Sequence, residues 1–336
     1  YASVSLKEDA LYASGWTADN KLARYRFAHD TDVGIFTVDN QLEGEFATGA
    51  LDHNLLVGLD YRHYAIDQVQ AAVFDPSGGL DLDPLHPVYG GIDVPPLGNP
   101  YLDQDLKRDQ LGIYAQDQIK FGDGWIATLN GRYDFVSTDI ENYTIGGVPT
   151  DKDEGEFTWR AALAYEFANG VTPYVSYSTS FNPTTTTDES GKLLDSETGR
   201  QWEAGIKYQP DFMDALITAA YFDITRQNVA STITVDGVPK TSAIGEVEAR
   251  GFETSIHANV SEGLKLIGAL TYIDMEVTKA TGGAFDGTPA GNTPIQVPDL
   301  TASLWADYAF QSVGLAGLSV AAGVGHIGKS WAGRAN

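Results

Sequence analysis

The sequence predicts an all-β protein, an antiparallel transmembrane β-barrel of which this chain supplies about thirteen strands. Long segments alternate apolar and polar residues with a period of two, which places the two kinds of side chain on opposite faces of a strand. The connections between these segments alternate between short and long, as they do in outer-membrane barrels with short periplasmic turns and long external loops. A soluble sandwich has no reason to sort its connections in this way.

Residues 157–167 show the alternation most clearly. Phe157, Trp159 and Leu163 fall on one parity, whereas Arg160 and Glu166 fall on the other. The same criterion places strands along the whole chain. They are expected over 1–12, 22–48, 54–70, 110–121, 125–138, 157–167, 172–181, 201–208, 215–227, 243–260, 264–278, 301–310 and 315–331.

The connections carry two further signals. Six of them are short, at 49–53, 122–124, 168–171, 209–214, 261–263 and 311–314. Aromatic residues collect beside these turns on the apolar face, as in a girdle at a membrane interface: Phe121, Trp125, Tyr165, Phe167, Tyr208, Tyr308 and Phe310. The longest connection, 71–105, contains six prolines, and a loop of that length is usually functional or disordered. Residues 141–155 are also expected to form a loop, and residues 30–33 an irregularity in their strand.

The number of expected strands indicates whether the barrel is complete. Bacterial barrels normally have an even count, and a barrel must close to pair its edge strands. An odd set of about thirteen strands predicts an open curved sheet. We therefore expect residues 1–336 to be one partial barrel domain, an internal fragment of a larger protein.

Composition excludes several classes. The net charge of −25 argues against nucleic acid as a partner, because phosphate binding needs clustered Lys and Arg. With no cysteine there is no disulfide framework and no thiolate metal site. The six histidines are scattered without metal-ligand spacing, and no catalytic motif occurs. The sequence thus predicts neither an enzyme nor a metalloprotein, although a soluble β-rich enzyme or binding module stays an alternative.

The polar face of the strands must be wet or covered by a polar domain, because unpaired charges in a dry core are costly. We predict that its charged residues form a salt-bridge ladder that lines a lumen and contacts a plug: Arg132, Asp134, Arg160, Glu166, Glu203 and Lys207.

Several runs are familiar as a set: FTVDNQLEGEFATG (36–49), HNLLVGLDY (53–61), YAQDQ (114–118), GRYD (131–134), FTWRAALAYEFANGVTPYVSYSTSFNP (157–183), GRQWEAGIKYQP (199–210), FDITRQNV (222–229), GEVEARGFE (245–253), LTYIDMEVTK (270–279) and VPDLTASLWADY (297–308). In these runs the chain resembles TonB-dependent siderophore receptors, and in particular their ferrichrome and hydroxamate branch.

The resemblance implies a barrel of about 22 strands with an N-terminal plug domain, in the bacterial outer membrane. It implies uptake of a ferric siderophore, energised through the TonB complex by way of the plug. Iron would then be cargo, with no resident cofactor. Lipid and lipopolysaccharide of the outer membrane would surround the barrel. The plug, the first strands and the last strands would lie outside residues 1–336.

The resemblance also implies ligand contacts. Carried over by position, they fall on Tyr12 or Trp16 and on Phe74, and aromatics in the longest connection add Tyr89 and Tyr101. Residues 13–21 depart from the family pattern, because they are shorter and lack its cysteine pair and Tyr-Gly-Tyr run. The ligand therefore stays open, and the alternative is another cargo such as cobalamin, a saccharide or a different metal chelate.

Overall fold

A computed structural model describes most of the chain. The described residues are 1–75, 77–88, 90, 92–145, 148–188, 190–235, 238–280, 289–312 and 314–331. They form thirteen antiparallel strands and one short 3-10 helix: β1 (Ala2–Trp16), β2 (Leu22–Thr48), β3 (Leu51–Phe74), β4 (Leu102–Phe121), β5 (Trp125–Asn142), η1 (Tyr143–Ile145), β6 (Val148–Tyr165), β7 (Val171–Asn182), β8 (Glu197–Tyr208), β9 (Asp214–Val235), β10 (Val238–Ser261), β11 (Leu264–Lys279), β12 (Leu300–Ala309) and β13 (Ser319–Ile327).

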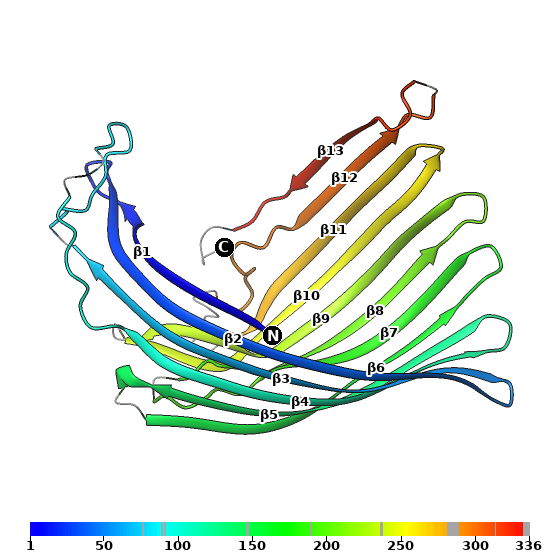
Figure 1. Ribbon diagram of the computed structural model, residues 1–336, viewed down its shortest axis with the longest axis horizontal. Helices are drawn as coiled ribbons and strands as arrows, with labels where there is room; N and C mark the ends of the chain where they lie inside the picture. The colour runs from blue at the N-terminus through cyan, green and yellow to red at the C-terminus, as the bar shows by residue number, and fades with distance from the viewer. Residues whose placement is uncertain are drawn as a thin grey trace. The chain divides into compact units, whose positions relative to one another are not determined.

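The strands follow one another in one sheet in chain order, from β1 to β13 (Figure 1). Each strand pairs with its neighbours in sequence, so β1 and β13 are the edge strands of the described sheet. The prediction of an all-β antiparallel sheet of thirteen strands, not closed on itself, is confirmed. Among the described residues, no helix is long and apolar enough to cross a membrane.

Several local expectations were wrong. β4 begins at residue 102 and not at 110, β9 ends at residue 235 and not at 227, and β13 spans Ser319–Ile327 rather than 315–331. Residues 148–155 belong to β6 rather than to a loop. The expected irregularity at 30–33 is absent from the pairing of β1 with β2, which runs without interruption from Ala2↔Ile35 to Ala13↔Arg24. The register shifts instead at Gly15, close to the turn between the two strands.

The chain divides into two compact units. The first comprises residues 1–40, 59–112 and 134–155, and the second comprises 41–58, 113–133 and 156–336. In the second unit Val229, Val247 and Val277 form a small buried cluster, against which Met275 packs. Because strands β9, β10 and β11 each supply one of these valines, the cluster ties three neighbouring strands together.

Short turns of the second unit interlock with one another. The carbonyl of Gly170 accepts a hydrogen bond of 2.9 Å from the amide of Gln209, which lies in the next short turn along the sheet. Gly124 accepts from Glu166 in the same way, and Gly263 from Ala309, both at 2.8 Å. The three glycines have φ of +139° (Gly124), +82° (Gly170) and +94° (Gly263). A left-handed conformation with so close a neighbour favours glycine.

Aromatic side chains form a belt on one face of the second unit. Tyr221 pairs with Phe252, which pairs with Tyr272, so the three side chains point to the same side of the sheet. Tyr177 lies between Trp159 and Trp202, with ring centroids 5.0 and 4.7 Å away. We call these residues the aromatic belt: Trp159, Tyr177, Trp202, Tyr221, Phe252 and Tyr272.

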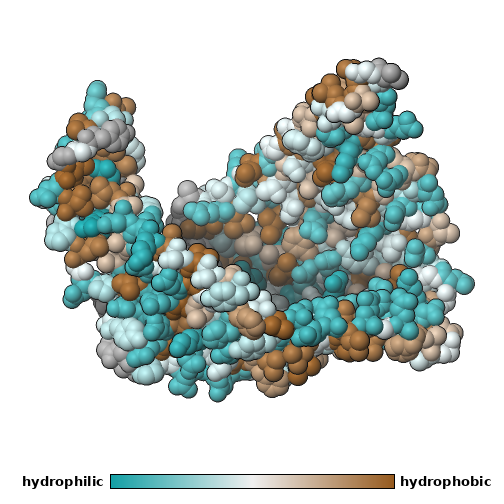
Figure 2. Space-filling view, in the orientation of Figure 1, coloured by the Kyte–Doolittle hydropathy of each residue, from teal (hydrophilic) through white to brown (hydrophobic). Residues whose placement is uncertain are grey.

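A second aromatic group lies beside the short turns, as the sequence predicted. Trp125 contacts Phe121 at 6.3 Å and Tyr165 at 5.0 Å, and Tyr165 contacts Phe167 at 4.6 Å between ring centroids. Figure 2 shows hydrophobic side chains reaching the surface among hydrophilic ones along the visible strands. An apolar exposed face with aromatics at both ends is typical of strands that cross a membrane.

Candidate site: an aromatic cluster on β1, β2 and β3

Four aromatic rings of the first unit come together on one face. Tyr12 of β1 pairs with Tyr25 of β2, and their ring centroids lie 6.1 Å apart. Phe27, two residues further along β2, meets Tyr12 edge to face at 5.7 Å. Phe74, the last residue of β3, stacks on Tyr25 at 4.8 Å with an interplanar angle of 17°. We call Tyr12, Tyr25, Phe27 and Phe74 the aromatic cluster.

Two of the four rings are exposed, and those of Tyr25 and Phe27 are half-buried. Tyr12 is 41% exposed and Phe74 66% exposed. Rings that stack in pairs yet keep large exposed faces can bind a bulky, partly apolar molecule, and the tyrosine hydroxyls add hydrogen bonding. Single exposed apolar residues are common on proteins, so it is the convergence of three strands that makes this a candidate site.

Polar groups surround the cluster. The Tyr12 hydroxyl donates a hydrogen bond to Glu8 Oε1, four residues away on the same face of β1. The Tyr101 hydroxyl donates to Gln70 Oε1 at 2.6 Å, and the Tyr101 amide donates to the Gln70 carbonyl at 3.0 Å. The pair of bonds fixes the end of the long connection against β3, four residues from Phe74.

The long connection between β3 and β4 packs against β2. Leu80 is fully buried, and its carbonyl accepts a hydrogen bond of 2.6 Å from Arg24 Nε. Leu82 pairs with Leu22 through backbone bonds in both directions. The described part of this connection is therefore anchored to the strand that carries Tyr25 and Phe27.

The structure places the predicted site residues in different surroundings. The structure brings Tyr12 and Phe74 into one cluster and places Tyr101 beside β3. Trp16 lies at the end of β1 and is 69% exposed, while Tyr89 lies outside the described residues. Sequence reasoning missed Tyr25 and Phe27, although their period-two spacing was a usable signal. A ligand-binding role for all of them stays a prediction.

Polar-face residues of the second unit line a hollow of about 1170 Å³. Its walls include Arg160, Glu166, Glu203 and Lys207, together with Tyr174. The four charged residues therefore share one hollow, and their predicted contact with a plug stays a prediction.

The interactions within this hollow differ from the expected salt-bridge ladder. Glu203 accepts hydrogen bonds from the Tyr174 hydroxyl at 2.6 Å and from Gln201 Nε2 at 2.8 Å. Lys207 Nζ lies 5.5 Å from the centre of the Tyr174 ring. The ring can lie there because residue 205 is glycine, where a Cβ would come within 2.7 Å of it. The Tyr174 side chain thus contacts the carboxylate of Glu203 through its hydroxyl and the ammonium group of Lys207 through its ring.

The other two polar-face residues have separate surroundings. Arg132 lies over the ring of Tyr114, with 5.6 Å from its guanidinium carbon to the ring centre. Asp134 is buried, and its Oδ1 accepts a hydrogen bond of 2.8 Å from Gln110 Nε2. Both contacts join β5 to β4, so each contributes to holding neighbouring strands in register.

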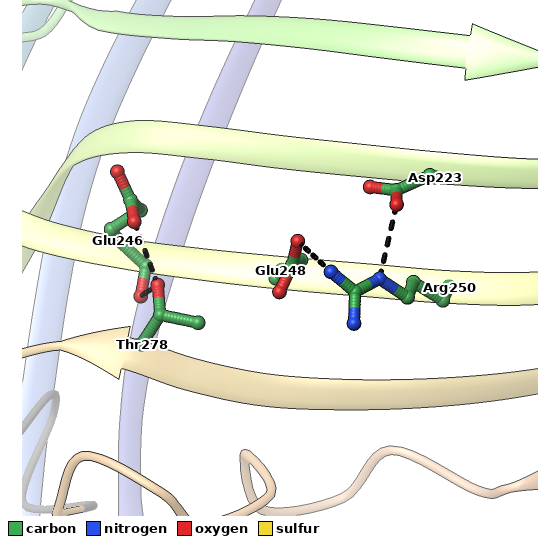
Figure 3. A network of polar contacts seen from close by, with 5 residues as sticks. All are labelled: Asp223, Glu246, Glu248, Arg250 and Thr278. Carbon is green, nitrogen blue, oxygen red and sulfur yellow. Dashed lines mark hydrogen bonds and ion pairs between the residues drawn. The ribbon is translucent and has the colours of Figure 1, made fainter.

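A charged layer spans β9 to β11, and Figure 3 shows five of its residues. Arg250 of β10 donates to Asp223 of β9 at 3.0 Å and also contacts Glu248. Glu246 accepts hydrogen bonds of 2.9 Å from Thr278 and from Lys279 of β11. Because positions 246, 248 and 250 share the parity of Phe252, this layer continues the face of the belt.

Histidine and acidic side chains connect neighbouring strands through hydrogen bonds. His53 Nδ1 lies 2.7 Å from Asp117 Oδ2, and His53 Nε2 lies 2.7 Å from Thr48 Oγ1. The imidazole stacks on Phe46 at 4.8 Å. In the described ranges, no group of three or more His, Asp or Glu side chains is placed to hold a metal ion.

The connection between β7 and β8 contains an aspartate that organises its backbone. Asp188 Oδ1 accepts hydrogen bonds from the Ser190 hydroxyl at 2.6 Å, the Ser190 amide at 2.8 Å and the Lys192 amide at 3.0 Å. The Ser190 hydroxyl is the main group that lowers the pKa of this carboxyl, with the two amides adding to it. The ionised form is thus the one that holds the turn.

A pH dependence follows from this lowered pKa. Stabilisation of the turn is fully present above the ordinary aspartate pKa of about 3.9 and is lost as the pH falls through the lower, folded-state pKa. Hydrogen exchange should therefore show protected Ser190 and Lys192 amides at neutral pH and loss of protection at strongly acidic pH. In Asp188→Asn, which cannot titrate, the protection should be independent of pH; an acid transition that persists there would contradict the assignment.

Comparison with known proteins agrees with this architecture. The family model described as "TonB dependent receptor-like, beta-barrel" matches residues 1–336. The crystal structure of the siderophore receptor PiuA from Acinetobacter baumannii superposes with a TM-score of 0.75 at 21% identity, over 97% of this chain and 51% of that one. At this identity the likeness concerns the fold.

Curated relatives are closer in sequence. The ferrichrome outer membrane transporter/phage receptor of Escherichia coli (strain K12) is 37% identical over 325 residues, 94% of this chain and 41% of that protein. The ferrioxamine B receptor of Salmonella typhimurium (strain SL1344) is 34% identical over 329 residues, 97% of this chain and 44% of that protein. The chain spans less than half the length of these relatives. It belongs to the family of TonB-dependent receptor β-barrels, which are proteins of the outer membrane.

Proposed function

We propose that the complete protein is an outer-membrane receptor that takes up ferric siderophores of the hydroxamate class. Two relatives that align with nearly the whole of this chain are named for ferrichrome and for ferrioxamine B. The observation that carries the proposal is the aromatic cluster, in which rings from three strands converge and those of Tyr12 and Phe74 stay exposed beside hydrogen-bonding groups. A siderophore offers the matching chemistry, an apolar backbone that carries polar chelating groups.

Transport of this kind needs binding and release rather than bond chemistry. We infer that residues 1–336 carry out no catalytic step and hold no resident cofactor, because iron enters as part of the ligand. The residues proposed to act are those of the aromatic cluster, with Tyr101 and Gln70 beside it.

Two further partners belong to the proposal. A plug domain outside residues 1–336 would contact the polar face, where Arg160, Glu166, Glu203 and Lys207 line one hollow, and TonB would act through that plug. Outer-membrane lipid and lipopolysaccharide would contact the aromatic belt and its charged layer. Arg250 and Lys279 supply the positive charges of that layer.

Uptake in cells tests the proposed function. Production of the complete protein in a Gram-negative strain that lacks its own hydroxamate receptors should restore growth under iron limitation with ferrichrome or ferrioxamine B as the iron source. Accumulation of radioactive iron should fall to background when the gene for TonB is deleted, because transport through a plugged barrel requires energy.

The controls separate the alternatives. Restored growth without TonB would contradict energised uptake, and restoration by neither siderophore would contradict the hydroxamate class. Cobalamin and a catecholate siderophore serve as competing cargoes, which should not reduce iron accumulation when added in excess.

A further inference from the structure

The aromatic cluster borders a carboxylate, that of Glu8, which no cation among the described residues neutralises. Glu8 lies on the face of β1 that carries Tyr12, and its Oε1 accepts the Tyr12 hydroxyl. Among the described residues, Oε2 of Glu8 has no hydrogen-bond partner. A carboxylate accepts through both oxygens and has about four lone-pair positions, so Glu8 retains acceptor capacity beside the rings.

The lysine and arginine side chains of these two strands, Lys7, Arg24 and Arg26, point away from the cluster, whereas His29 pairs with Glu8 and shares the face of the rings. Lys7 and Arg26 have the opposite parity to Glu8 and Tyr25 on their strands, and each is engaged there. Lys7 Nζ lies 2.8 Å from Asp30 Oδ2, and Arg26 Nη2 lies 2.6 Å from Asp9 Oδ2. The alternation of β1 and β2 thus places the paired charges on one face and leaves the face of the rings with a net negative charge.

Both components of this face attract a cation. Aromatic faces stabilise a positive charge that lies over the ring, and a carboxylate hydrogen-bonds an ammonium group more strongly than a neutral donor. The Tyr12 ring is the link, because it lies against Tyr25 and Phe27 and its hydroxyl reaches Glu8.

We propose that Glu8 and the rings of Tyr12 and Tyr25 bind an ammonium group of the ferric siderophore, so that the site selects cationic over neutral hydroxamate complexes. This inference rests on the proposed function and narrows its substrate class. Glu8 is then a specificity residue, and the rest of the cluster contacts the apolar part of the same ligand.

A matched pair of ligands tests the selectivity. Ferric desferrioxamine B carries a terminal ammonium group, and its N-acetylated form keeps the same hydroxamates without the charge. Titration of the complete protein in detergent should show about tenfold tighter binding of the ammonium form. In Glu8→Gln the ratio of the two dissociation constants should fall to about one.

The control variant is Asp9→Asn, which removes the same charge from the adjacent residue on the opposite face of β1. It should leave the ratio at its original value, since a general effect of net charge would change both variants alike. Equal ratios in Glu8→Gln and Asp9→Asn would overturn the assignment to Glu8.

The two proposals fail in different ways. Equal affinity of the unaltered protein for both ligands would overturn the ammonium site while leaving the uptake function in place. Binding of neither ligand would instead overturn the hydroxamate function, and with it this inference. A Tyr12→Phe variant, which keeps the ring but frees Glu8, should retain part of the preference.

Discussion

Phe74→Ala is expected to lower the affinity of the complete protein for ferric hydroxamates at least about tenfold, as truncation of a central aromatic anchor does in other interfaces. The ring ends β3, is two-thirds exposed and stacks on Tyr25 at 4.8 Å. Its removal deletes one contact surface and also leaves the Tyr25 ring without its stacking partner. Fluorescence titration with ferrichrome and ferrioxamine B measures the loss.

The matched control for this variant is Phe157→Ala. Phe157 is 55% exposed, but it lies on β6 in the second unit, with the parity of the aromatic belt. The substitution removes the same ring and should leave ligand affinity unchanged. An unchanged affinity in Phe74→Ala, or equal losses in both variants, would remove the aromatic cluster from the binding site.

Gly170→Ala should reduce the free energy of unfolding of the complete protein by about 2 to 4 kcal/mol, through backbone strain together with overpacking. Residue 170 has a φ of +82°, and an added Cβ would overlap the carbonyl oxygen of Gln209. That neighbour is backbone and cannot rotate away. Relief of the overlap must therefore stretch the 2.9 Å bond by which Gln209 meets Gly170.

Gly49→Ala separates the effect of backbone strain from the effect of steric overlap with a neighbouring turn. Residue 49 has a φ of +66°, in a short turn, but nothing lies within 4 Å of its added Cβ. The substitution should lower the free energy of unfolding by about 1 kcal/mol, through the left-handed backbone conformation alone. Urea unfolding in detergent, followed by tryptophan fluorescence, compares the two variants, and equal midpoints would show that the turn interlock contributes nothing to stability.

The fold was predictable because each long strand has one apolar face. For β2 the expected and observed bounds coincide at residues 22 and 48. The beginning of β6 was missed, because residues 148–155 read VPTDKDEG and show no apolar alternation. A strand segment with both faces in water does not need apolar residues at alternate positions. Its backbone pairing therefore cannot be predicted from the sequence pattern.

The candidate site was only partly predictable for a related reason. Tyr12 and Phe74 could be named one at a time, but their convergence depends on register. Tyr12 reaches Tyr25 because β1 and β2 pair without a shift from Ala2 to Ala13, which the sequence does not specify when both faces are polar or mixed. The unneutralised Glu8 becomes visible only after the register assigns Lys7 and Arg26 to the other face.

The pairing of each strand with its sequence neighbours has a consequence for how such receptors change during evolution. Inserting or deleting one hairpin alters a single junction and leaves all other strand pairs as they were. The glycine carbonyl of each interlocked short turn accepts a hydrogen bond from a backbone amide of the neighbouring hairpin. Because both groups belong to the backbone, this bond does not depend on the side chains of the neighbour. Each hairpin is therefore a self-contained unit of this sheet, and the loop that it carries can vary without a change in the strand pairs.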